Sequence, residues 1–464
     1  MTLTEAWMRR PSMTTSQTDT EIEKQTLSED ELALSFANRH TNLRWVQEWG
    51  RWFLWDGRVW IQDKTLHVWD TVREFLRGAS LVHKKPNELK KASTVTSVEK
   101  MSRSDRRYAA TTEQWDREAM LLNCPNGVLN LASGEIEPAD PSLYMTKIAG
   151  AEIQGGECPR WKTFLKDITR GDRELAEFLR RVIGYCLTGD TREHALFFLY
   201  GNGANGKSTF LNVVTRILGD YAIDAPMETF TVSSSDRHPT ELAMLRGARL
   251  VTAVETEEGR RWAESRIKQL TGGDRVTARF MRQDFFTYRP QFKLLIAGNH
   301  RPRLNSVDEA MRRRFHLIPF EANFTGKACI KNMEELLLEE GPAILRWAVD
   351  GCAYWQTDGL SPPAIVREAT EHYFANQDVM GEWLSERCEM GPEFWETPTR
   401  LFQSWRAYSK EAEIPVGTRA SFNDRMETSG FRKLRERQRG RYWSGIKLNA
   451  EFEPRCLDYT DSGA

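Results

Sequence analysis

Nine consecutive residues, from Gly201 to Thr209, combine the residue types and the spacing that bind phosphate groups. The stretch reads GNGANGKST, with glycine at its first, third and sixth positions and Lys207 and Ser208 after the last of them. Glycine lets backbone N–H groups surround phosphate oxygens, the lysine reaches the outer phosphates, and the serine hydroxyl binds Mg²⁺. We therefore expect ATP and Mg²⁺ as cofactors, with an ordinary glycine-rich turn as the alternative. The expected ligands are Gly201, Gly203, Ala204, Asn205, Gly206, Lys207, Ser208 and Thr209.

The segments on either side of this loop predict the setting that a phosphate site needs. Residues 194–200, HALFFLY, form an apolar, aromatic-rich run that is typical of a buried parallel strand. Residues 207–219, KSTFLNVVTRILG, place apolar side chains at helical spacing before Gly219, which ends the helix. A strand, a glycine loop and a helix are therefore expected in that order.

Acidic residues follow a second apolar strand, in the segment RLVTAVETEEG at 249–259. Carboxylates at such a strand end hold Mg²⁺ through water and orient an attacking water toward the γ-phosphate. Glu255 is the first choice for these roles, and Glu257 is its partner or competitor. Because Thr256 separates the two acids, which of them is the catalytic base stays open. An exposed strand end without chemistry is the alternative.

Two further segments place polar groups beside apolar strands. FKLLIAGNHRP, at 292–302, delivers Asn299 to the carboxyl end of a strand, where open α/β sheets bind ligands. An asparagine there polarises the attacking water or contacts the γ-phosphate. DEAMRRRFHLIPF, at 308–320, places Arg312, Arg313 and Arg314 before another strand. Such arginines suit an arginine finger that acts on a neighbouring subunit's nucleotide and so requires a ring, whereas a basic surface loop is the alternative.

The composition excludes several classes of protein. The 464 residues carry a formal net charge of −1, and the seven cysteines include no C-x-x-C pair, which indicates a reducing compartment rather than a disulfide framework or zinc site. No apolar run approaches the roughly 18 residues of a membrane-spanning helix, and the first residues lack the apolar core of a secretory signal. We expect a cytoplasmic protein without a membrane partner.

Taken in order, the segments GNGANGKST, LVTAVETEEG, IKQLTGGDRVTARF, LLIAGNHRP and RRRFHLIPF resemble the superfamily 3 helicases. The group that they resemble most is the phage and plasmid primase-helicase family, which includes the poxvirus primase-helicase. The resemblance covers about residues 40–450. It implies a ring, usually a homo-hexamer, of AAA+ modules that hydrolyse ATP between subunits and move 3′ to 5′ on single-stranded DNA. It also implies a bacterial or phage-infected cell.

The family's motifs assign roles to individual residues of this chain. The matches are Lys207 and Ser208 for phosphate and Mg²⁺, Glu255 for the acidic motif, Asn299 for the sensor, Arg313 and Arg314 for the paired arginines, and Lys268 for the lysine of K-x-L-T-G-G-D, which we expect to contact DNA. The segment VTARFMRQDFFTYRPQF, at 276–292, resembles the family's pore hairpin. There Arg279 and Arg282 would contact DNA phosphates. The phenylalanines at 280, 285 and 286 are expected to pack the hairpin, with base contact as the alternative.

The predicted fold is multidomain α/β, with an AAA+ P-loop ATPase core, an N-terminal α+β collar domain and a C-terminal winged helix-turn-helix. In the collar, RWFLWDGRVWIQD predicts two strands joined by a two-residue turn at Asp56-Gly57. The tryptophans of this region are expected in its core rather than stacked on bases. The predicted parts are a disordered tail at 1–35, the collar at 36–159, the ATPase at 160–345, a linker at 346–375, the winged helix at 376–450 and a tail at 451–464.

The last domain is predicted to contain three amphipathic helices and then an antiparallel ribbon. In FRKLRERQRGRYWSGIKL, at 431–448, alternate arginines lie on one strand face or around a turn at Gly440. Since like charges on one face repel, an anionic partner explains them better than solvent, which remains the alternative. The predicted duplex DNA contacts are Arg419, Ser421, Asn423 and Arg425 to base edges and Arg435, Arg437, Arg439 and Arg441 to phosphates.

The leading interpretation is an ATP-dependent replicative DNA helicase of a phage, prophage or mobile element. About 40 residues precede the collar, too few for a primase domain, so we expect any primase to be a separate polypeptide. One alternative is an origin-binding initiator ATPase without processive unwinding. Another is a small-molecule kinase, against which Asn299, the paired arginines and the lack of a lid-like segment argue.

Overall fold

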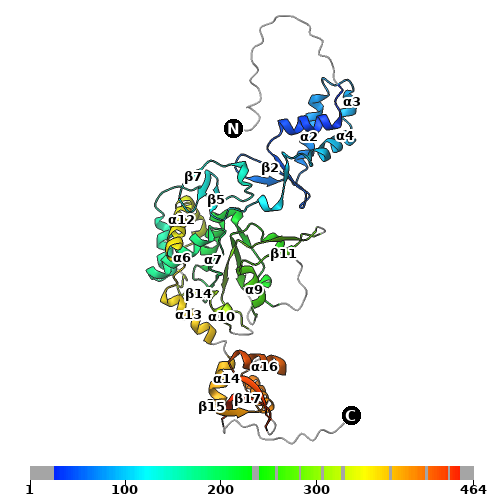
Figure 1. Ribbon diagram of the computed structural model, residues 1–464. Helices are drawn as coiled ribbons and strands as arrows, with labels where there is room; N and C mark the ends of the chain where they lie inside the picture. Colours follow the sequence, from blue (N-terminus) through cyan, green and yellow to red (C-terminus); the bar gives the residue numbers. More distant parts are fainter. Residues whose placement is uncertain are drawn as a thin grey trace, which may run out of the picture. The chain divides into compact units, whose positions relative to one another are not determined.

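The computed structural model describes residues 26–449, apart from 233–239, 256–259, 282–283, 305–307, 326–329, 376–378, 413–415 and 437–438. The chain divides into two units, one of residues 1–117 and 140–146 and the other of 118–139 and 147–464. It is a multidomain α/β protein with a parallel sheet, as predicted (Figure 1). Glu257, Arg282, Arg437, the first 25 residues and the predicted tail at 451–464 lie outside the described residues.

The first unit packs helices against a small sheet around aromatic side chains. The sheet has the order β3-β2-β1-β4, with β1 antiparallel to β2 and parallel to β4. Trp45, Trp52 and Trp60 are at most 6% exposed, so they belong to the core, as predicted. The elements are α1 (Glu29–Arg39), β1 (Leu43–Val46), β2 (Arg51–Trp55), β3 (Trp60–Gln62), α2 (His67–Ala79), α3 (Pro86–Leu89), α4 (Ala92–Ser102) and β4 (Ala109–Ala110).

Helix α1 begins earlier than the predicted end of the disordered tail at residue 35. Its first residue is Glu29, and Ser28 and Glu31 form a reciprocal capping box at its start. Leu32 and Phe36 are buried in the core of the first unit. The polar composition of this region therefore concealed an amphipathic helix, because only one face of that helix is apolar.

The turn between β2 and β3 is longer than the predicted two residues. Trp55 pairs with Trp60, so the loop contains residues 56–59. The Asp56 carboxylate accepts hydrogen bonds from the backbone N–H groups of Arg58 and Val59, each at 2.8 Å. This side chain closes a four-residue turn, and it competes successfully with the tighter hairpin turn.

The domain predicted at 36–159 divides between the two units. Residues 118–139 belong to the second unit and form a three-stranded antiparallel sheet of β5 (Leu121–Cys124), β6 (Gly127–Asn130) and β7 (Ile136–Glu137). Leu122 and Leu129 lie in the largest core cluster of the second unit. The backbone N–H of Asn123 donates to the Tyr221 hydroxyl at 3.1 Å. Buried contacts, rather than composition, therefore decide this boundary.

The second unit is built on a five-stranded parallel sheet with the order β14-β8-β13-β10-β9. The predicted strand and helix around the glycine loop are confirmed, and Gly219 caps the helix end. No described helix is long and apolar enough to cross a membrane. The strands are β8 (Leu196–Tyr200), β9 (Ala222–Asp224), β10 (Leu250–Glu255), β11 (Val276–Ala278), β12 (Phe286–Tyr288), β13 (Lys293–Gly298) and β14 (Phe315–Pro319). The helices are α5 (Pro159–Ile168), α6 (Arg173–Cys186), α7 (Lys207–Leu218), α8 (Thr240–Met244), α9 (Glu264–Thr271), α10 (Glu309–Arg312), α11 (Met333–Leu338), α12 (Gly341–Asp358) and α13 (Ala364–Ala375).

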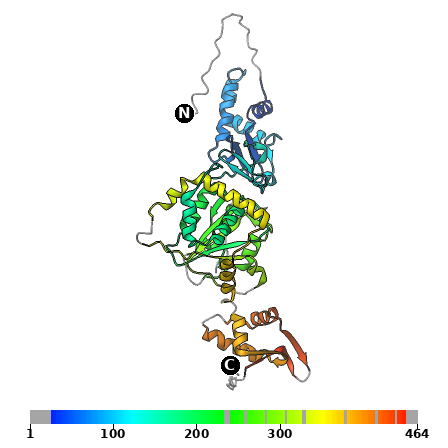
Figure 2. The same ribbon diagram turned by 90° about the vertical axis from the view of Figure 1, so that its left-hand side faces the viewer.

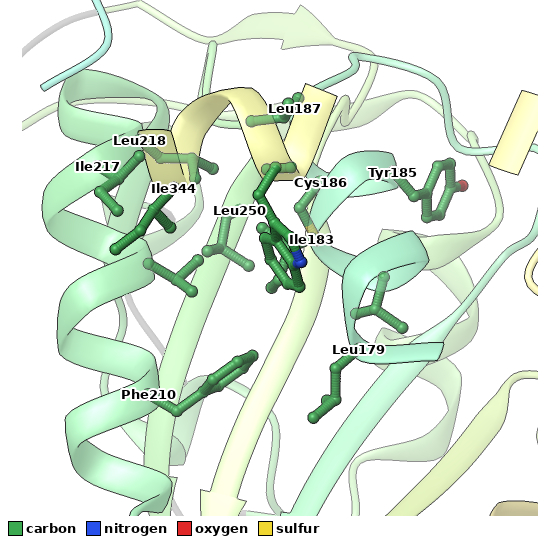
Figure 3. Packing of buried hydrophobic residues seen from close by; sticks show 14 of the residues in the cluster. Leu179, Ile183, Tyr185, Cys186, Leu187, Phe210, Ile217, Leu218, Leu250 and Ile344 are labelled. Carbon is green, nitrogen blue, oxygen red and sulfur yellow. The ribbon is translucent and has the colours of Figure 1, made fainter. Parts of the chain in front are cut away.

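Helices cover both faces of this sheet. On one face, α6, α7 and α12 enclose a core that includes Phe210 and Leu250 (Figure 3). On the other face, residues of α9, α10 and α13 surround a second core. Alternate residues of β8 serve the two sides, since Phe197 belongs to the first cluster and Phe198 to the second. Burial on both faces explains why this strand is a continuous apolar run.

The segment predicted as a linker, 346–375, packs against the five-stranded parallel sheet and belongs to the domain built on it, which we call the central domain. It contains most of α12 and all of α13. Arg180 of α6 donates to the Asp350 carboxylate at 2.9 Å, and a Cβ on Gly184 would lie 2.1 Å from the backbone nitrogen of Cys352. Helices α6 and α12 therefore pack closely, while α13 adds Tyr373 to the core on the other face of the sheet. The prolines that suggested a linker lie only in the bend between the two helices.

The C-terminal residues form three helices and a three-stranded antiparallel sheet with the order β15-β17-β16. The helices and the final ribbon are predicted by the sequence, whereas β15 is not. The fully buried Trp383, Trp405 and Trp443 form the centre of a separate core. The elements are α14 (Val379–Arg387), β15 (Cys388–Glu396), α15 (Pro398–Glu411), α16 (Arg419–Thr428), β16 (Arg432–Glu436) and β17 (Gly440–Leu448).

The buried ammonium of Lys293 makes stability depend on pH. Its Nζ donates to the carbonyl oxygens of Thr188, Asp190 and Gln291, and burial lowers its pKa to about 7. An unfolded lysine keeps its proton up to about pH 10.4, so between these values the folded state binds fewer protons. We expect the free energy of unfolding to rise with pH from about 7 to 9, by up to about 1.4 kcal/mol per unit. Denaturant unfolding of wild type beside Lys293→Gln tests this, because the neutral variant lacks that slope. Parallel pH profiles would contradict it.

Candidate nucleotide-binding site

The glycine loop between β8 and α7 follows a path that excludes side chains at two positions. Gly206 is the N-cap of α7 with a φ of 85°, and a Cβ there would lie 2.6 Å from the Ile168 side chain. A Cβ on Gly201 would lie 2.2 Å from the carbonyl oxygen of Phe320. The loop therefore presents backbone at the N-terminus of a 12-residue helix, where partial positive charge favours anions. This geometry fits a phosphate ligand.

Lys207 lies buried at the start of α7, and its ammonium donates hydrogen bonds to neutral oxygens of the described residues. Its Nζ donates to the carbonyl oxygen of Gly201 at 2.7 Å and to the side-chain oxygens of Asn205 and Asn299 at 3.1 and 3.2 Å. Burial lowers the pKa of this ammonium below its usual value. A buried cation that is held by neutral oxygens is suited to an anionic ligand, which would compensate its charge.

Three strand ends bring predicted catalytic residues to one edge of the sheet. Glu255, the last residue of β10, pairs with Gly298 of β13, which in turn pairs with Tyr200 of β8. The glycine loop follows Tyr200 directly, and Asn299 follows Gly298 directly. Since ligands of open α/β sheets bind beyond the carboxyl ends of the strands, this edge is the expected place for a nucleotide. The structure thus brings Lys207, Asn299 and Glu255 to a single edge.

Two arginines at this edge were missed by the sequence analysis. Glu255 is 2% exposed, and its Oε1 lies 3.9 Å from Nε of Arg260, which also donates to the Glu228 carboxylate at 2.7 Å. Arg301 lies over the Tyr200 ring at 5.0 Å from its centroid. Arg260 directly follows ETEEG, and Arg301 lies within GNHRP. Their closeness to these motifs is the sequence signal by which they could have been found.

Some of the other loop residues form hydrogen bonds within the protein, and others are exposed to solvent. The Asn205 amide donates to the carbonyl oxygen of Phe320 at 2.8 Å, and the Ala204 carbonyl accepts from the backbone N–H of Phe324 at 2.7 Å. These bonds fasten the loop to the segment after β14. Ser208, in the first turn of α7, is exposed, so its hydroxyl is accessible to a cation.

The arginines at 312–314 occupy three different environments. Arg312 pairs with Glu371 at 2.6 Å. Arg314 is 7% exposed, and its Nε donates to the Thr271 hydroxyl at 3.2 Å. Arg313 is exposed. The two arginines that were predicted as a pair therefore differ, because Arg313 faces solvent and Arg314 is hydrogen-bonded within its own subunit.

Lys268, predicted to contact DNA, is engaged within its own subunit. Its Nζ forms an ion pair with the Asp308 carboxylate, which also caps α10 by accepting from the backbone N–H of Met311 at 2.7 Å. The Arg314–Thr271 hydrogen bond is a second connection between α9 and the end of α10. The ion pair of Lys268 therefore connects α9 to the start of α10, and its acidic partner lies 40 residues away in the sequence.

The β11–β12 hairpin extends from the central domain, which matches the predicted pair of short strands (Figure 1). Phe280 stacks on Phe286 with ring centroids 5.7 Å apart, as the packing interpretation predicts. Phe285 instead is 59% exposed, and the guanidinium of Arg279 lies over its ring at 4.7 Å. Packing therefore accounts for the Phe280 and Phe286 rings but not for the Phe285 ring.

The arginines of α16 that were predicted to reach base edges make contacts inside the C-terminal domain. Arg419 donates to the Thr399 hydroxyl at 2.7 Å. The guanidinium of Arg425 lies over the Trp405 ring at 5.8 Å. Base contact by either residue would require these interactions to be exchanged, which the sequence pattern did not indicate.

The basic ribbon turns back on itself, so its arginines do not line one strand. Arg435 of β16 lies opposite Arg441 of β17, and the chain turns between residues 436 and 440. Arg439 is in that turn, and Gly440 begins β17. Of the two arrangements left open by the sequence, the structure has the one in which charges gather around a turn.

Two family models match separate segments of this chain. The family model described as D5 N terminal like matches residues 31–170, and a family of unknown function (DUF5906) matches residues 199–314. A protein of Acanthamoeba polyphaga mimivirus, named "Putative helicase", is 31% identical over 216 residues, which are 45% of this chain and 22% of that protein. Primase D5 of Fowlpox virus is 26% identical over 163 residues, or 34% of this chain and 20% of that protein. These matches support a relationship of this chain to the D5-like primase-helicases.

Other relatives carry similar names. A protein of Frog virus 3, also named "Putative helicase", is 24% identical over 267 residues, which are 53% of this chain and 27% of that protein. This chain thus spans less than a third of the length of each of these three viral relatives. Among solved structures, the apo C-terminal region of NrS-1 is 8% identical with a TM-score of 0.48, covering 90% of this chain and 99% of that one.

Proposed function

We propose that the chain is the ATP-driven motor of a replicative DNA helicase of a virus, phage or mobile element. The observation that carries this proposal is the meeting of the glycine loop, Lys207, Glu255 and Asn299 at the carboxyl edge of one parallel sheet. The helicase and primase names of the viral relatives support the choice of a DNA motor over other nucleotide hydrolases.

The site's residues divide the chemistry of ATP hydrolysis among them. The glycine loop would hold the phosphates through backbone N–H groups, and Lys207 would neutralise charge on the outer ones. Ser208 and Glu255 would hold Mg²⁺, which when bound neutralises charge on the phosphates. Asn299 would hold the attacking water or the γ-phosphate. Glu255 is the proposed base, with Glu257 kept as its competitor.

A ring completes the site. Arg313 is exposed on α10's C-terminal side, while Lys268 and Arg314 fix the position of that helix. We assign Arg313 to the nucleotide of the neighbouring subunit in a homo-hexamer. There it would stabilise the charge that develops during phosphoryl transfer. The β11–β12 hairpin, with Arg279 and Phe285, would contact single-stranded DNA inside the ring.

Strand separation on a forked duplex tests the proposal. We expect ATP-dependent unwinding from a 3′ single-stranded tail, none from a matched 5′ tail, and none by the Lys207→Ala variant. Unwinding from the 5′ tail alone would contradict the proposed polarity. ATP turnover that ignores DNA would contradict a DNA motor altogether.

The C-terminal domain favours a second candidate, an origin-binding initiator. Its three helices and basic hairpin are the kinds of element that make up a winged helix-turn-helix, in which a helix and a hairpin contact duplex DNA. An initiator would protect one specific duplex sequence from nuclease cleavage and would separate strands poorly. Strong unwinding without any sequence-specific protection would reject it.

A further inference from the structure

The outer face of the C-terminal sheet carries aromatic side chains that its core does not use. In β17, Trp443 points to the helices and is fully buried. Side chains alternate along a strand, so its neighbours Tyr442 and Ser444 lie on the opposite face. Trp395 of β15 pairs with Ser444, and Leu434 of β16 pairs with Tyr442, which places all of them on that outer face.

Trp395 and Leu434 on this face are exposed, whereas the other tryptophans of the domain are buried. Trp395 is 39% exposed and Leu434 is 43% exposed, whereas Trp383 and Trp405 are at most 1% exposed. The Trp395 and Tyr442 rings meet edge to face, with centroids 6.0 Å apart. A large ring that stays at the surface while similar rings fill the core is available to a ligand.

The charge around this face identifies the class of ligand. The guanidinium of Arg439 lies 5.0 Å from the centroid of the Trp395 ring, and Arg432 is on the same face at the position opposite Ser444. The described hairpin residues between 432 and 441 contain a single acid, Glu436. The basic residues among them are Arg432, Lys433, Arg435, Arg439 and Arg441. Because the whole chain has a net charge of −1, this positive charge is local.

We propose that this outer face binds single-stranded DNA, with bases against Trp395 and Tyr442 and phosphates beside Arg432 and Arg439. Aromatic rings flanked by arginines are the arrangement that holds unpaired bases and their phosphates. Bases of a duplex are already stacked on one another, so a duplex could use the arginines and not the rings. Glu436 pairs with Arg439 at 3.4 Å, so it offsets one of these positive charges, and a partner protein would need acidic residues to offset the others. This surface is separate from the nucleotide edge and acts without ATP hydrolysis, so it goes beyond the proposed motor function.

Photo-cross-linking of the full chain tests the proposal directly. The probe is a short oligothymidine in which iodouracil replaces some bases, and the cross-linked peptides are mapped by mass spectrometry. We expect adducts on Trp395 or Tyr442 without nucleotide, also in the Lys207→Ala protein. A blunt duplex that carries the same base should give no such adducts. Adducts confined to other segments would overturn the proposal, whether or not the protein unwinds DNA.

Binding of a labelled short oligothymidine supplies the second readout. We expect Trp395→Ala to weaken this binding about 5- to 160-fold, the range that corresponds to the loss of one stacked base, and Trp395→Phe to restore most of it. Tyr354→Ala, which removes a 47% exposed ring from α12, is the matched control and should have no effect. An equal loss of duplex affinity in Trp395→Ala would overturn the proposal, as would a loss of self-association without a loss of DNA binding. Equal melting temperatures of the variants would establish that the fold is intact.

Discussion

Replacing Lys207 with alanine is expected to abolish ATP hydrolysis while leaving the fold intact. The Lys207 ammonium is buried at the start of α7 and donates hydrogen bonds to three neutral oxygens. An anionic ligand such as a phosphate would compensate its positive charge. Removing one charge-stabilising donor of this kind lowers turnover about 10²- to 10³-fold. Since burial lowers the pKa of this lysine, its burial costs stability, and the variant should melt no lower than wild type.

Steady-state ATP hydrolysis and thermal melting check this expectation together. Lys166→Ala is the matched control, because Lys166 is an exposed lysine on α5. It should hydrolyse ATP at the wild-type rate. Turnover by Lys207→Ala at more than a tenth of the wild-type rate would contradict the assignment of the glycine loop as the phosphate site.

Arg313→Ala and Arg314→Ala are expected to fail in different ways. Arg313 is exposed, so its loss should leave melting and nucleotide binding unchanged and lower turnover about 10³-fold or more, as for an arginine finger. Arg314 donates to Thr271 and to the Ala310 carbonyl at 2.6 Å. Its loss should lower the melting temperature, because buried acceptors lose their donor.

A mixing experiment separates a trans arginine from a local one. Subunits with Lys207→Ala and subunits with Arg313→Ala are each inactive alone, but a mixed ring contains interfaces with an intact loop facing an intact Arg313. We therefore expect partial recovery of turnover on mixing. Recovery with Arg314→Ala subunits and none with Arg313→Ala subunits would reverse the assignment.

Local features of this protein were predictable because neighbouring residues determine them. The strand, glycine loop and helix at 194–219 follow from apolar periodicity, a required backbone path and a glycine stop, and each lies within a few residues of its cause. The tryptophan core of the first unit and the three C-terminal helices were predictable for the same reason. The hairpin loop at 56–59 was not, because the side chain of Asp56 provides hydrogen bonds that favour a longer turn.

Longer-range features depended on partners that the sequence does not indicate. The segment at 346–375 looked like a linker, yet α12 is held against α6 by close backbone approach at Gly184 and by the Arg180–Asp350 pair. Lys268, which is predicted to contact DNA, forms an ion pair with Asp308, a partner that its neighbours in the sequence do not indicate. In both cases, the partners lie far apart in the sequence and are brought together by the tertiary structure.

The sequence alone determined that this protein carries a glycine-rich loop between a buried strand and a helix, because that motif is contiguous. It also determined that acids and an asparagine follow later apolar strands and that three arginines precede another. The parallel register of β8, β13 and β10 decided that Lys207, Asn299 and Glu255 meet at one edge. Tertiary packing likewise decided that Arg314 is internal while Arg313 faces solvent, since burial depends on which elements cover a side chain and not on its neighbours in the chain.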